Sequence, residues 1–224
     1  MRVVALIPAL NEAGTIADVV RGVATHVARV VVVSDGSTDG TRERARDAGA
    51  TVLPHAETTG KGQAIRTGLA HILAGEDVDY VLILDGDLQH LPAEAPRLLE
   101  AAHRTGADLV VGERQFDRES MPAARYYANV VGSWALSSFM GSQLHDTQCG
   151  FRLFRAAMLR RLRLRATGYD IETEMLVKVG RLGGHIVHVP VTAVYRGGSS
   201  KLRPVRDTTR TCFRAVYYRY LERF

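Results

Sequence analysis

The strongest chemical signal in this chain is a pair of carboxylates at the end of an apolar run. Leu82-Ile83-Leu84 leads directly into Asp85-Gly86-Asp87. Two acids this close repel each other unless a cation lies between them. Mg²⁺ and Mn²⁺ take oxygen ligands and commonly combine one or two carboxylates with substrate phosphates, and Gln89 could add a carbonyl oxygen. The segment therefore predicts a divalent-metal site at Asp85, Asp87 and Gln89, with a capped turn before the next helix as the alternative.

A further carboxylate, Asp35, ends the β-branched run Val30–Val33. Gly36 permits a tight turn, and Asp39 can cap the helix that follows. Turn and cap chemistry explains these two residues better than it explains Asp35, which could accept hydrogen bonds from the edge of a nucleobase. The chain contains no Gly-x-Gly-x-x-Gly and no Walker P-loop, which disfavours a dinucleotide-binding Rossmann site and a P-loop site.

Two more segments carry candidate ligand-binding residues. Pro8-Ala9-Leu10-Asn11-Glu12 follows the apolar run Val3–Ile7, although it could simply turn the chain into a helix. Lys61, in Thr59-Gly60-Lys61-Gly62, is one of three lysines. It could reach a phosphate, or it could be a solvated residue at the start of a helix.

Alternating strands and helices must position these residues. Short apolar runs predict strands, and apolar residues at helical spacing predict helices. The expected strands are Val3–Ile7, Val30–Val33, Thr51–Leu53, Tyr80–Leu84 and Leu109–Val111, and the expected helices are Ala13–His26, Asp39–Ala48, Lys61–Ala74 and Pro92–His103. This alternation predicts an α/β fold with a mostly parallel sheet and helices on both faces. Ligands bind such sheets beyond the carboxyl ends of the strands, so the loops after three strands should meet in one site.

The second half of the chain has a different pattern. We expect helices at Ala124–Gly141, Arg155–Leu162 and Ile171–Leu182, strands at Phe151–Phe154 and Ile186–Val194, and a loop at Arg196–Arg203. Pro190 places the last strand at a sheet edge or a bulge. No linker or repeat is visible, so a single domain over residues 1–224 is predicted.

The formal net charge of +5 lies entirely in residues 201–224, which contain seven basic and two acidic residues. This distribution disfavours a uniformly basic nucleic-acid binder. Thr208–Phe224 is expected to form an amphipathic helix that either contacts an anionic membrane surface or packs on the domain. We expect no signal peptide, because Pro8 ends the first apolar run too early. We expect no transmembrane segment, because the longest charge-free stretch, Tyr126–His145, is too polar.

Taken together, the segments at 4–12, 33–41, 60–62 and 84–90 resemble those of the family 2 glycosyltransferases of GT-A fold. Within that family the chain is most similar to the polyprenyl- (dolichyl-) phosphate sugar synthases, over about residues 3–207. The resemblance implies a nucleotide-sugar and metal half at 1–112, an acceptor half at 113–207 and a tail helix at 208–224. It assigns the donor nucleotide to Pro8, Leu10, Glu12, Asp35 and Lys61, and the metal to Asp85, Asp87 and Gln89.

The resemblance continues in the second half, where the arginines of lipid-phosphate enzymes grip phosphates. It implies phosphate-binding roles for Arg114, Arg125, Asn129, Lys201 and Arg203, with catalytic roles for Arg114 and Arg125 beside Asp85 and Asp87. Asp146–Arg152 and Tyr169–Glu174 resemble the acceptor side. Arg152 and Arg155 are interpreted as surface arginines.

The implied activity is an inverting, metal-dependent transfer of a hexose from a nucleotide sugar to polyprenyl phosphate on the cytoplasmic face of the cell membrane. The cofactor is Mg²⁺ or Mn²⁺, and GDP-mannose is favoured over UDP-glucose as donor. A lipid phosphate is already anionic near neutral pH, so no strong base is required. A hydroxyl acceptor would need one, and Glu172 or Glu174 is then the candidate. The alternatives are a soluble hydroxyl acceptor and a non-catalytic sugar-nucleotide-binding protein.

Overall fold

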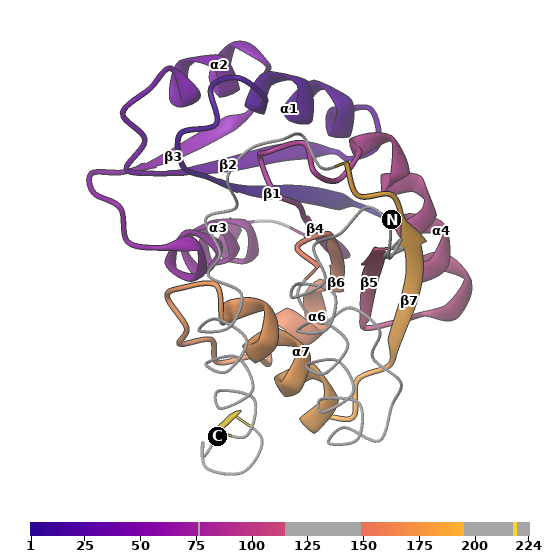
Figure 1. Cartoon of the computed structure of the whole chain (residues 1–224). Helices are drawn as coiled ribbons and strands as arrows, with labels where there is room; N and C mark the ends of the chain where they lie inside the picture. Colours follow the sequence, from indigo (N-terminus) through magenta and orange to yellow (C-terminus); the bar gives the residue numbers. More distant parts are fainter. Residues whose placement is uncertain (76, 115–148, 195–216, 219–224) are drawn as a thin grey trace, which may run out of the picture.

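The computed structural model describes residues 1–75, 77–114, 149–194 and 217–218. Its described strands form one seven-stranded sheet in the order β3-β2-β1-β4-β6-β5-β7 (Figure 1). The strands are β1 (Val3–Ala9), β2 (Arg29–Asp35), β3 (Thr51–His55), β4 (Tyr80–Ile83), β5 (Leu109–Arg114), β6 (Arg152–Arg155) and β7 (Ile186–Val191).

The sheet is mostly parallel, as predicted. β1 pairs in parallel with β2 and β4, β2 with β3, and β5 with β7. β6 runs antiparallel to both of its neighbours, β4 and β5. Because β1, β2 and β4 are adjacent and parallel, their carboxyl ends meet at one edge of the sheet.

Helices cover both faces of the sheet (Figure 1). The helical elements are α1 (Ile16–Ala24), α2 (Thr41–Asp47), α3 (Lys61–Gly75), the 3₁₀ turn η1 (Pro92–Glu94), α4 (Ala95–Thr105), α6 (Ala156–Leu159) and α7 (Ile171–Arg181). α1 and α2 lie on the face opposite to α3. The prediction of an α/β fold with two helical layers is therefore confirmed, and the arrangement is GT-A-like.

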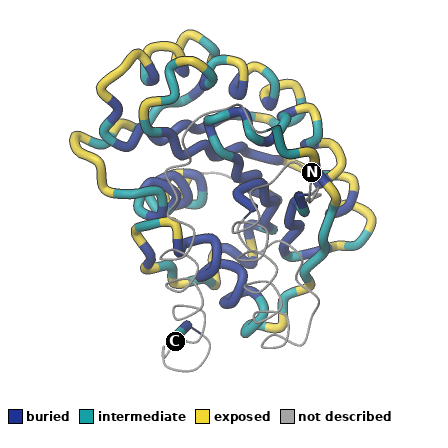
Figure 2. The backbone as a smooth tube through the Cα atoms, viewed as in Figure 1, coloured by how far each residue is buried: buried dark blue, intermediate teal, exposed yellow. Residues whose placement is uncertain are grey.

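The core lies along the central strands and the inner sides of the helices (Figure 2). All seven residues of β1 are buried, as expected of a strand that is covered on both faces. α1 buries Ile16, Val19, Val20 and Val23 on one side. This spacing produces the apolar stripe that a helix needs to pack on a sheet.

Several element boundaries differ from the sequence-based expectation. α1 begins at Ile16 rather than Ala13, because the Glu12 carbonyl first accepts bonds from the amides of Thr15 and Ile16 in a turn. The expected helix at Pro92–His103 divides into η1 and α4, and Gly106 ends α4 in the left-handed conformation. Pro190 lies in β7 at the sheet edge, where its missing amide hydrogen costs little.

The expected helix at Ala124–Gly141 and the loop at Arg196–Arg203 lie outside the described residues, as does most of Thr208–Phe224. Within that last segment Tyr218 is buried. Its hydroxyl donates a 3.1 Å hydrogen bond to Asp170 Oδ2, and its carbonyl accepts one from Arg181. At this residue the chain packs on α7. In the described part of the chain, no helix combines the length and the apolar character that crossing a membrane requires.

Candidate functional site

The loops that follow β1, β2 and β4 are joined to one another by hydrogen bonds. The Glu12 amide donates to Thr41 Oγ1 at 2.8 Å, and Thr15 Oγ1 donates to the Gly86 carbonyl at 2.7 Å. Asn11, which has a φ of 55°, accepts a bond from the Thr38 amide at its side-chain oxygen. The three loops therefore form one continuous edge, as the parallel topology predicts.

Asp35 is buried at the end of β2, where it holds the loop between β3 and α3. Its Oδ1 accepts bonds from the Thr59 amide at 2.9 Å and the Thr59 hydroxyl at 2.7 Å, and it lies 2.7 Å from His55 Nδ1. Its Oδ2 accepts a bond from the Gly60 amide at 2.8 Å. Burial alone would raise the pKa of Asp35, but these hydrogen bonds, with that from His55 the largest, lower it overall. The Asp35 carboxylate thus fixes the position of Thr59 and Gly60, the two residues before Lys61.

Glycines bring the start of α3 against the loop that precedes α7. Gly60 has a φ of 103°, and a side chain there would collide with the Thr167 carbonyl. A Cβ at Gly62 would lie 2.6 Å from the Ala166 carbonyl. The Gln63 amide donates to the Thr167 carbonyl at 3.2 Å. This close approach carries Lys61, in the first turn of α3, to the amino end of α7.

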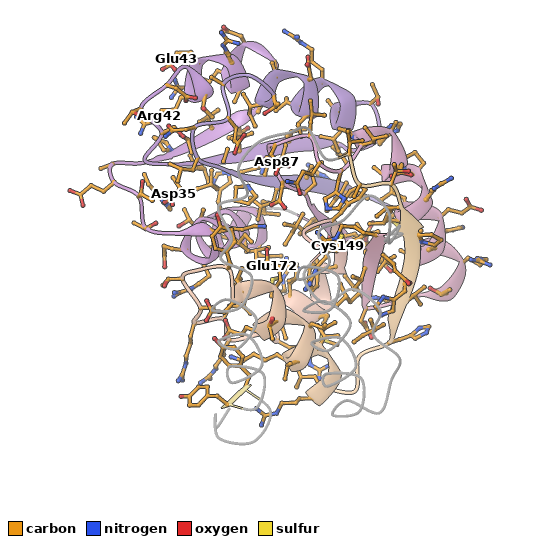
Figure 3. The ribbon with its side chains drawn as sticks, viewed as in Figure 1. Asp35, Arg42, Glu43, Asp87, Cys149 and Glu172 are labelled. Carbon is orange, nitrogen blue, oxygen red and sulfur yellow. The ribbon has the colours of Figure 1, made fainter. Side chains whose placement is uncertain are left out.

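Lys61 lies between two carboxylates from different parts of the chain. Its Nζ is 2.6 Å from Asp85 Oδ1, after β4, and 2.6 Å from Glu172 Oε1, in the first turn of α7. The side chains of Lys61 and Glu172 are 15% and 9% exposed. Glu172 Oε2 is buried and has no hydrogen-bond partner within the described ranges. In Figure 3, Glu172, Asp87 and Cys149 lie in the middle of the molecule, with Asp35 toward α2.

The pKa values of this cluster follow from its charges. Burial lowers the pKa of Lys61, but the charges of Asp85 and Glu172 outweigh burial and raise it well above its ordinary value. Burial raises the pKa of Asp85, but the Lys61 ammonium, helped by the charges of His90 and Arg114, lowers it overall. Both groups are therefore charged across the physiological range.

Asp87 shows the opposite shift, although the charge of Lys61 acts on it as well. Burial and then the negative charge of Asp85 raise its pKa above the ordinary value. Its Oδ1 accepts a 2.9 Å bond from the Gln89 amide. A divalent cation would relieve this crowding of charge, so Asp85 and Asp87 fit a metal. No group of three His, Cys, Asp or Glu suited to a metal is found among the described residues, so phosphate or water oxygens would complete the coordination.

Arg114 ends β5 and is 8% exposed. Its positive charge helps to lower the pKa of Asp85. Arg114 therefore acts electrostatically on the carboxylate site. The other predicted phosphate-binding residues, Arg125, Asn129, Lys201 and Arg203, lie outside the described part of the chain. Pro8 is buried in β1, while Leu10 and Glu12 are half-buried in the loop after it.

Arg152 corrects one sequence-based interpretation, because it is a buried residue and not a surface arginine. It is 2% exposed, and its guanidinium donates to the carbonyls of Cys149 at 2.7 Å and Glu172 at 2.6 Å. The physical reason is that the side chain of Arg152 points to the face of the sheet on which the start of α7 lies, where two backbone carbonyls accept its hydrogen bonds. The apolar neighbours of Arg152 in β6, Leu153 and Phe154, were the available signal.

Gly150 is a second residue whose role the sequence analysis missed. A Cβ on Gly150 would collide with Asp85 Oδ2, so the backbone there forms one wall of the carboxylate site. The adjacent Cys149 is fully buried, with its Sγ 3.6 Å from His90 Nε2. By contrast, a Cβ on Gly86 would lie 3.4 Å from its nearest neighbour, which is an ordinary contact distance.

Glu172 and Glu174, the two candidate bases, lie in different environments. Glu174 is fully buried and accepts bonds from the amides of Arg165 at 2.9 Å and Ala166 at 2.7 Å. Its Oε1 also lies 2.7 Å from Lys178 Nζ. These contacts hold the loop that precedes α7. Of the two glutamates, only Glu172 contacts Lys61 in the described structure.

Comparisons with known proteins agree with this architecture. The family model for glycosyl transferase family 2 matches residues 4–164. The chain is 38% identical over 210 residues to the glycosyltransferase AglJ of Haloferax volcanii, covering 90% of this chain and 67% of AglJ. It is 35% identical over 216 residues to the undecaprenyl-phosphate mannosyltransferase of Micrococcus luteus, covering 90% of this chain and 88% of that protein.

Similar solved structures include glucosyl-3-phosphoglycerate synthase of Mycobacterium tuberculosis. Its complex with phosphoglyceric acid has a TM-score of 0.72 and 25% identity, covering 97% of this chain and 78% of that one. Its complex with Mn²⁺, UDP and phosphoglyceric acid has a TM-score of 0.71 and 25% identity, covering 97% and 76%. The sequence matches, the fold and the carboxylates of Asp85 and Asp87 all point to the same family. The chain belongs to glycosyl transferase family 2 and is a glycosyltransferase.

Proposed function

We propose that this enzyme transfers a hexose, with inversion, from a nucleotide sugar to polyprenyl phosphate, with GDP-mannose favoured over UDP-glucose as the donor. The named activity of the Micrococcus luteus relative supports this acceptor and sugar. We place the reaction at the cytoplasmic face of the cell membrane, with the enzyme bound peripherally.

The observation that carries the acceptor assignment is the pairing of both candidate bases with lysines. Glu172 Oε1 lies 2.6 Å from Lys61, and Glu174 Oε1 lies 2.7 Å from Lys178. Neither residue has its whole carboxylate available to take a hydroxyl proton. This arrangement suits an acceptor that arrives already anionic, as a lipid phosphate does.

Asp85, Asp87 and the side-chain oxygen of Gln89 would hold the Mg²⁺ or Mn²⁺ ion, and the backbone amide of Gln89 also donates to Asp87. The Mn²⁺ and UDP in the glucosyl-3-phosphoglycerate synthase structure support this assignment. A bound metal offsets the charge of the donor diphosphate and stabilises it as a leaving group.

The chain's own residues then bind and orient the substrates. We assign Lys61 to the donor phosphates, and Arg114, whose charge acts on Asp85, to offsetting negative charge where the two phosphate groups approach. An oxygen of the acceptor phosphate attacks the anomeric carbon opposite the diphosphate. The bond from that carbon to the diphosphate breaks, and the configuration inverts.

A second candidate is transfer to a soluble hydroxyl acceptor. Glu172 Oε2, which is buried without a hydrogen-bond partner in the part of the chain described, favours it, because such an atom could take a hydroxyl proton. The structural neighbour that binds phosphoglyceric acid is consistent with it. A non-catalytic sugar-nucleotide-binding protein is disfavoured, because Asp85, Asp87 and Lys61 are all present and adjoining.

A donor and acceptor panel tests these assignments. GDP-mannose and UDP-glucose are supplied with Mg²⁺ or Mn²⁺ and either a short-chain polyprenyl phosphate or phosphoglyceric acid. We expect transfer to polyprenyl phosphate, its loss in Asp85→Asn and Asp87→Asn, and its retention in Asp18→Asn, a control at an exposed acid of α1. Full activity in both active-site variants would overturn the metal assignment.

Glu172→Gln separates the two acceptor classes. Transfer to a phosphate should be kept within about tenfold, whereas loss of a general base costs on the order of a hundredfold or more. Transfer to phosphoglyceric acid alone, abolished by Glu172→Gln, would overturn the lipid acceptor.

A further inference from the structure

Two segments that are far apart in the sequence lie side by side on the face covered by α3. The chain from Arg160 to Thr167 runs along α3 in the opposite direction. Arg160 Nη2 donates to the Leu73 carbonyl near the end of α3 at 3.4 Å. Arg66 Nη1 donates to the Arg165 carbonyl at 3.4 Å, and the Gln63 amide to the Thr167 carbonyl at 3.2 Å. Figure 1 shows this loop beside α3.

The two neighbouring segments, α3 and residues 160–167, carry several basic side chains and no acidic ones. We call the set the arginine edge; it consists of Arg66, Arg160, Arg161, Arg163 and Arg165. The last four are exposed and Arg66 is half-buried. Residues 59–75 and 149–169 contain no Asp or Glu, although the chain has 24 acids in 224 residues, which by composition alone would put about four there. An arginine-rich composition does not explain this lack of acids.

The arginine edge leads into the active site. At the start of α3 it reaches Lys61, which contacts Asp85 and Glu172. Tyr169 lies at the same end, 51% exposed, with its ring centroid 5.9 Å from Lys61 Nζ. An exposed tyrosine ring with a cation nearby is typical of surfaces that lie at the boundary between water and lipid.

We propose that the arginine edge binds the anionic headgroups of a lipid bilayer and so presents the site around Lys61 to the membrane. The inference rests on the proposed lipid acceptor, which must reach the site from a bilayer. An edge of several separate arginines suits many singly charged headgroups in one plane, and each basic residue near such a surface adds about fivefold to partition. The assignment differs from the predicted tail helix, because it uses residues that precede α7.

Binding to an extended nucleic acid fits the charges less well. Residues 1–150 contain 13 basic and 19 acidic residues, so the larger part of the chain would repel a long polyanion that extended beyond the edge. This alternative is an outcome of the test below.

The experiment is co-sedimentation of the full chain with vesicles of mixed phosphatidylglycerol and phosphatidylcholine, compared with phosphatidylcholine alone. The test variant is Arg161→Gln/Arg163→Gln/Arg165→Gln. The Arg163 carbonyl accepts a bond from Lys178, and the Arg165 carbonyl and amide bond to Arg66 and Glu174. These bonds use backbone atoms, so the substitutions leave them in place. We expect wild-type binding that requires the anionic lipid and weakens with salt, and a loss of about a hundredfold in the test variant.

A matched control removes the same charge elsewhere. Arg21→Gln/Arg46→Gln/Arg104→Gln alters three exposed arginines on α1, α2 and α4 and should partition like the wild type. Replacing the three test arginines by lysine keeps the charge and should keep binding, which separates lost charge from misfolding. Equal partition of the glutamine test and control variants would overturn the proposal. So would equal wild-type binding to neutral vesicles, or displacement from vesicles by duplex DNA.

Transfer to a short-chain polyprenyl phosphate without vesicles reports on the proposed function separately. The test variant should keep this activity, because the carboxylates that contact Lys61 in the described part of the chain come from Asp85 and Glu172, which the substitutions leave unchanged. Absence of the activity in wild type would refute the proposed function, while the vesicle measurement would still report on the arginine edge.

Discussion

Replacing Lys61 by methionine removes the ammonium that lies between two carboxylates. In the wild type that ammonium is 2.6 Å from an oxygen of Asp85 and 2.6 Å from an oxygen of Glu172. Methionine keeps the length and most of the apolar contact of the side chain. The variant therefore isolates the charge, and Lys61→Met should leave two crowded carboxylates without their shared cation.

The expected loss of stability follows from the burial of these groups. Removing one partner of a buried ion pair costs about 3–5 kcal/mol. Asp85 is 26% exposed, and solvent reduces its share, so the lower end, about 3 kcal/mol, applies. For a chain of this size that corresponds to a fall in Tm of roughly 6–12 °C.

The pH dependence of this loss has a definite sign. In the wild type the pKa of Asp85 is lowered overall, because Lys61 outweighs burial, so the group stabilises the fold above its unfolded pKa. Without the ammonium, burial dominates and raises the pKa of Asp85, so the charged form becomes a cost that acidification relieves. The difference in Tm between variant and wild type should therefore be smaller at about pH 5 than at about pH 7.5.

Thermal unfolding followed by circular dichroism measures both effects. Glu172→Gln and the double variant Lys61→Met/Glu172→Gln complete a cycle, in which we expect a coupling of about 1–3 kcal/mol. The role assigned to Lys61 would be refuted if Lys61→Met melted within about 2 °C of the wild type. It would also be refuted if the losses of stability of the two single variants added up to that of the double variant.

Three further outcomes are expected. Gly150→Ala should lower kcat/KM about a hundredfold by displacing the Asp85 carboxylate, whereas Gly86→Ala should stay within about twofold because the added methyl group meets only ordinary contacts. Asp35→Asn should lower the free energy of unfolding, measured in urea at neutral pH, by about 2 kcal/mol. Hydrogen bonds outweigh burial and lower the pKa of Asp35, so the difference in unfolding free energy between variant and wild type should shrink as the pH falls below about 4. Glu174→Gln should lower the free energy of unfolding by about 3 kcal/mol, because it removes the carboxylate that pairs with the buried Lys178 ammonium. Unchanged unfolding would contradict the structural role of Glu174.

Much of the site could be anticipated from local sequence. Apolar runs that end in polar residues located the loops after β1, β2 and β4, and the parallel alternation implied that they meet. The metal and donor roles of the individual residues in these loops stay predictions.

The local sequence does not distinguish Glu172 from Glu174 as the partner of Lys61. Both lie in the first turn of α7, and the local pattern offers either one as the candidate base. Residues two positions apart on a helix point to different sides, so the two side chains have different partners in the folded chain. Which one faces Lys61 depends on how α7 approaches α3, through the close contacts of Gly60 and Gly62 with the loop at 166–167.

By itself, the sequence determined the α/β class, the succession of strands along the chain with the carboxylates that follow them, and the resemblance to family 2 glycosyltransferases, because all three depend on patterns within a few consecutive residues. The tertiary structure alone decided the partners of the charges. β6 lies between β4 and β5 and buries Arg152, and α7 brings Glu172 to Lys61. Such partners come from contacts between segments distant in the chain, and no local pattern encodes the direction from which they arrive.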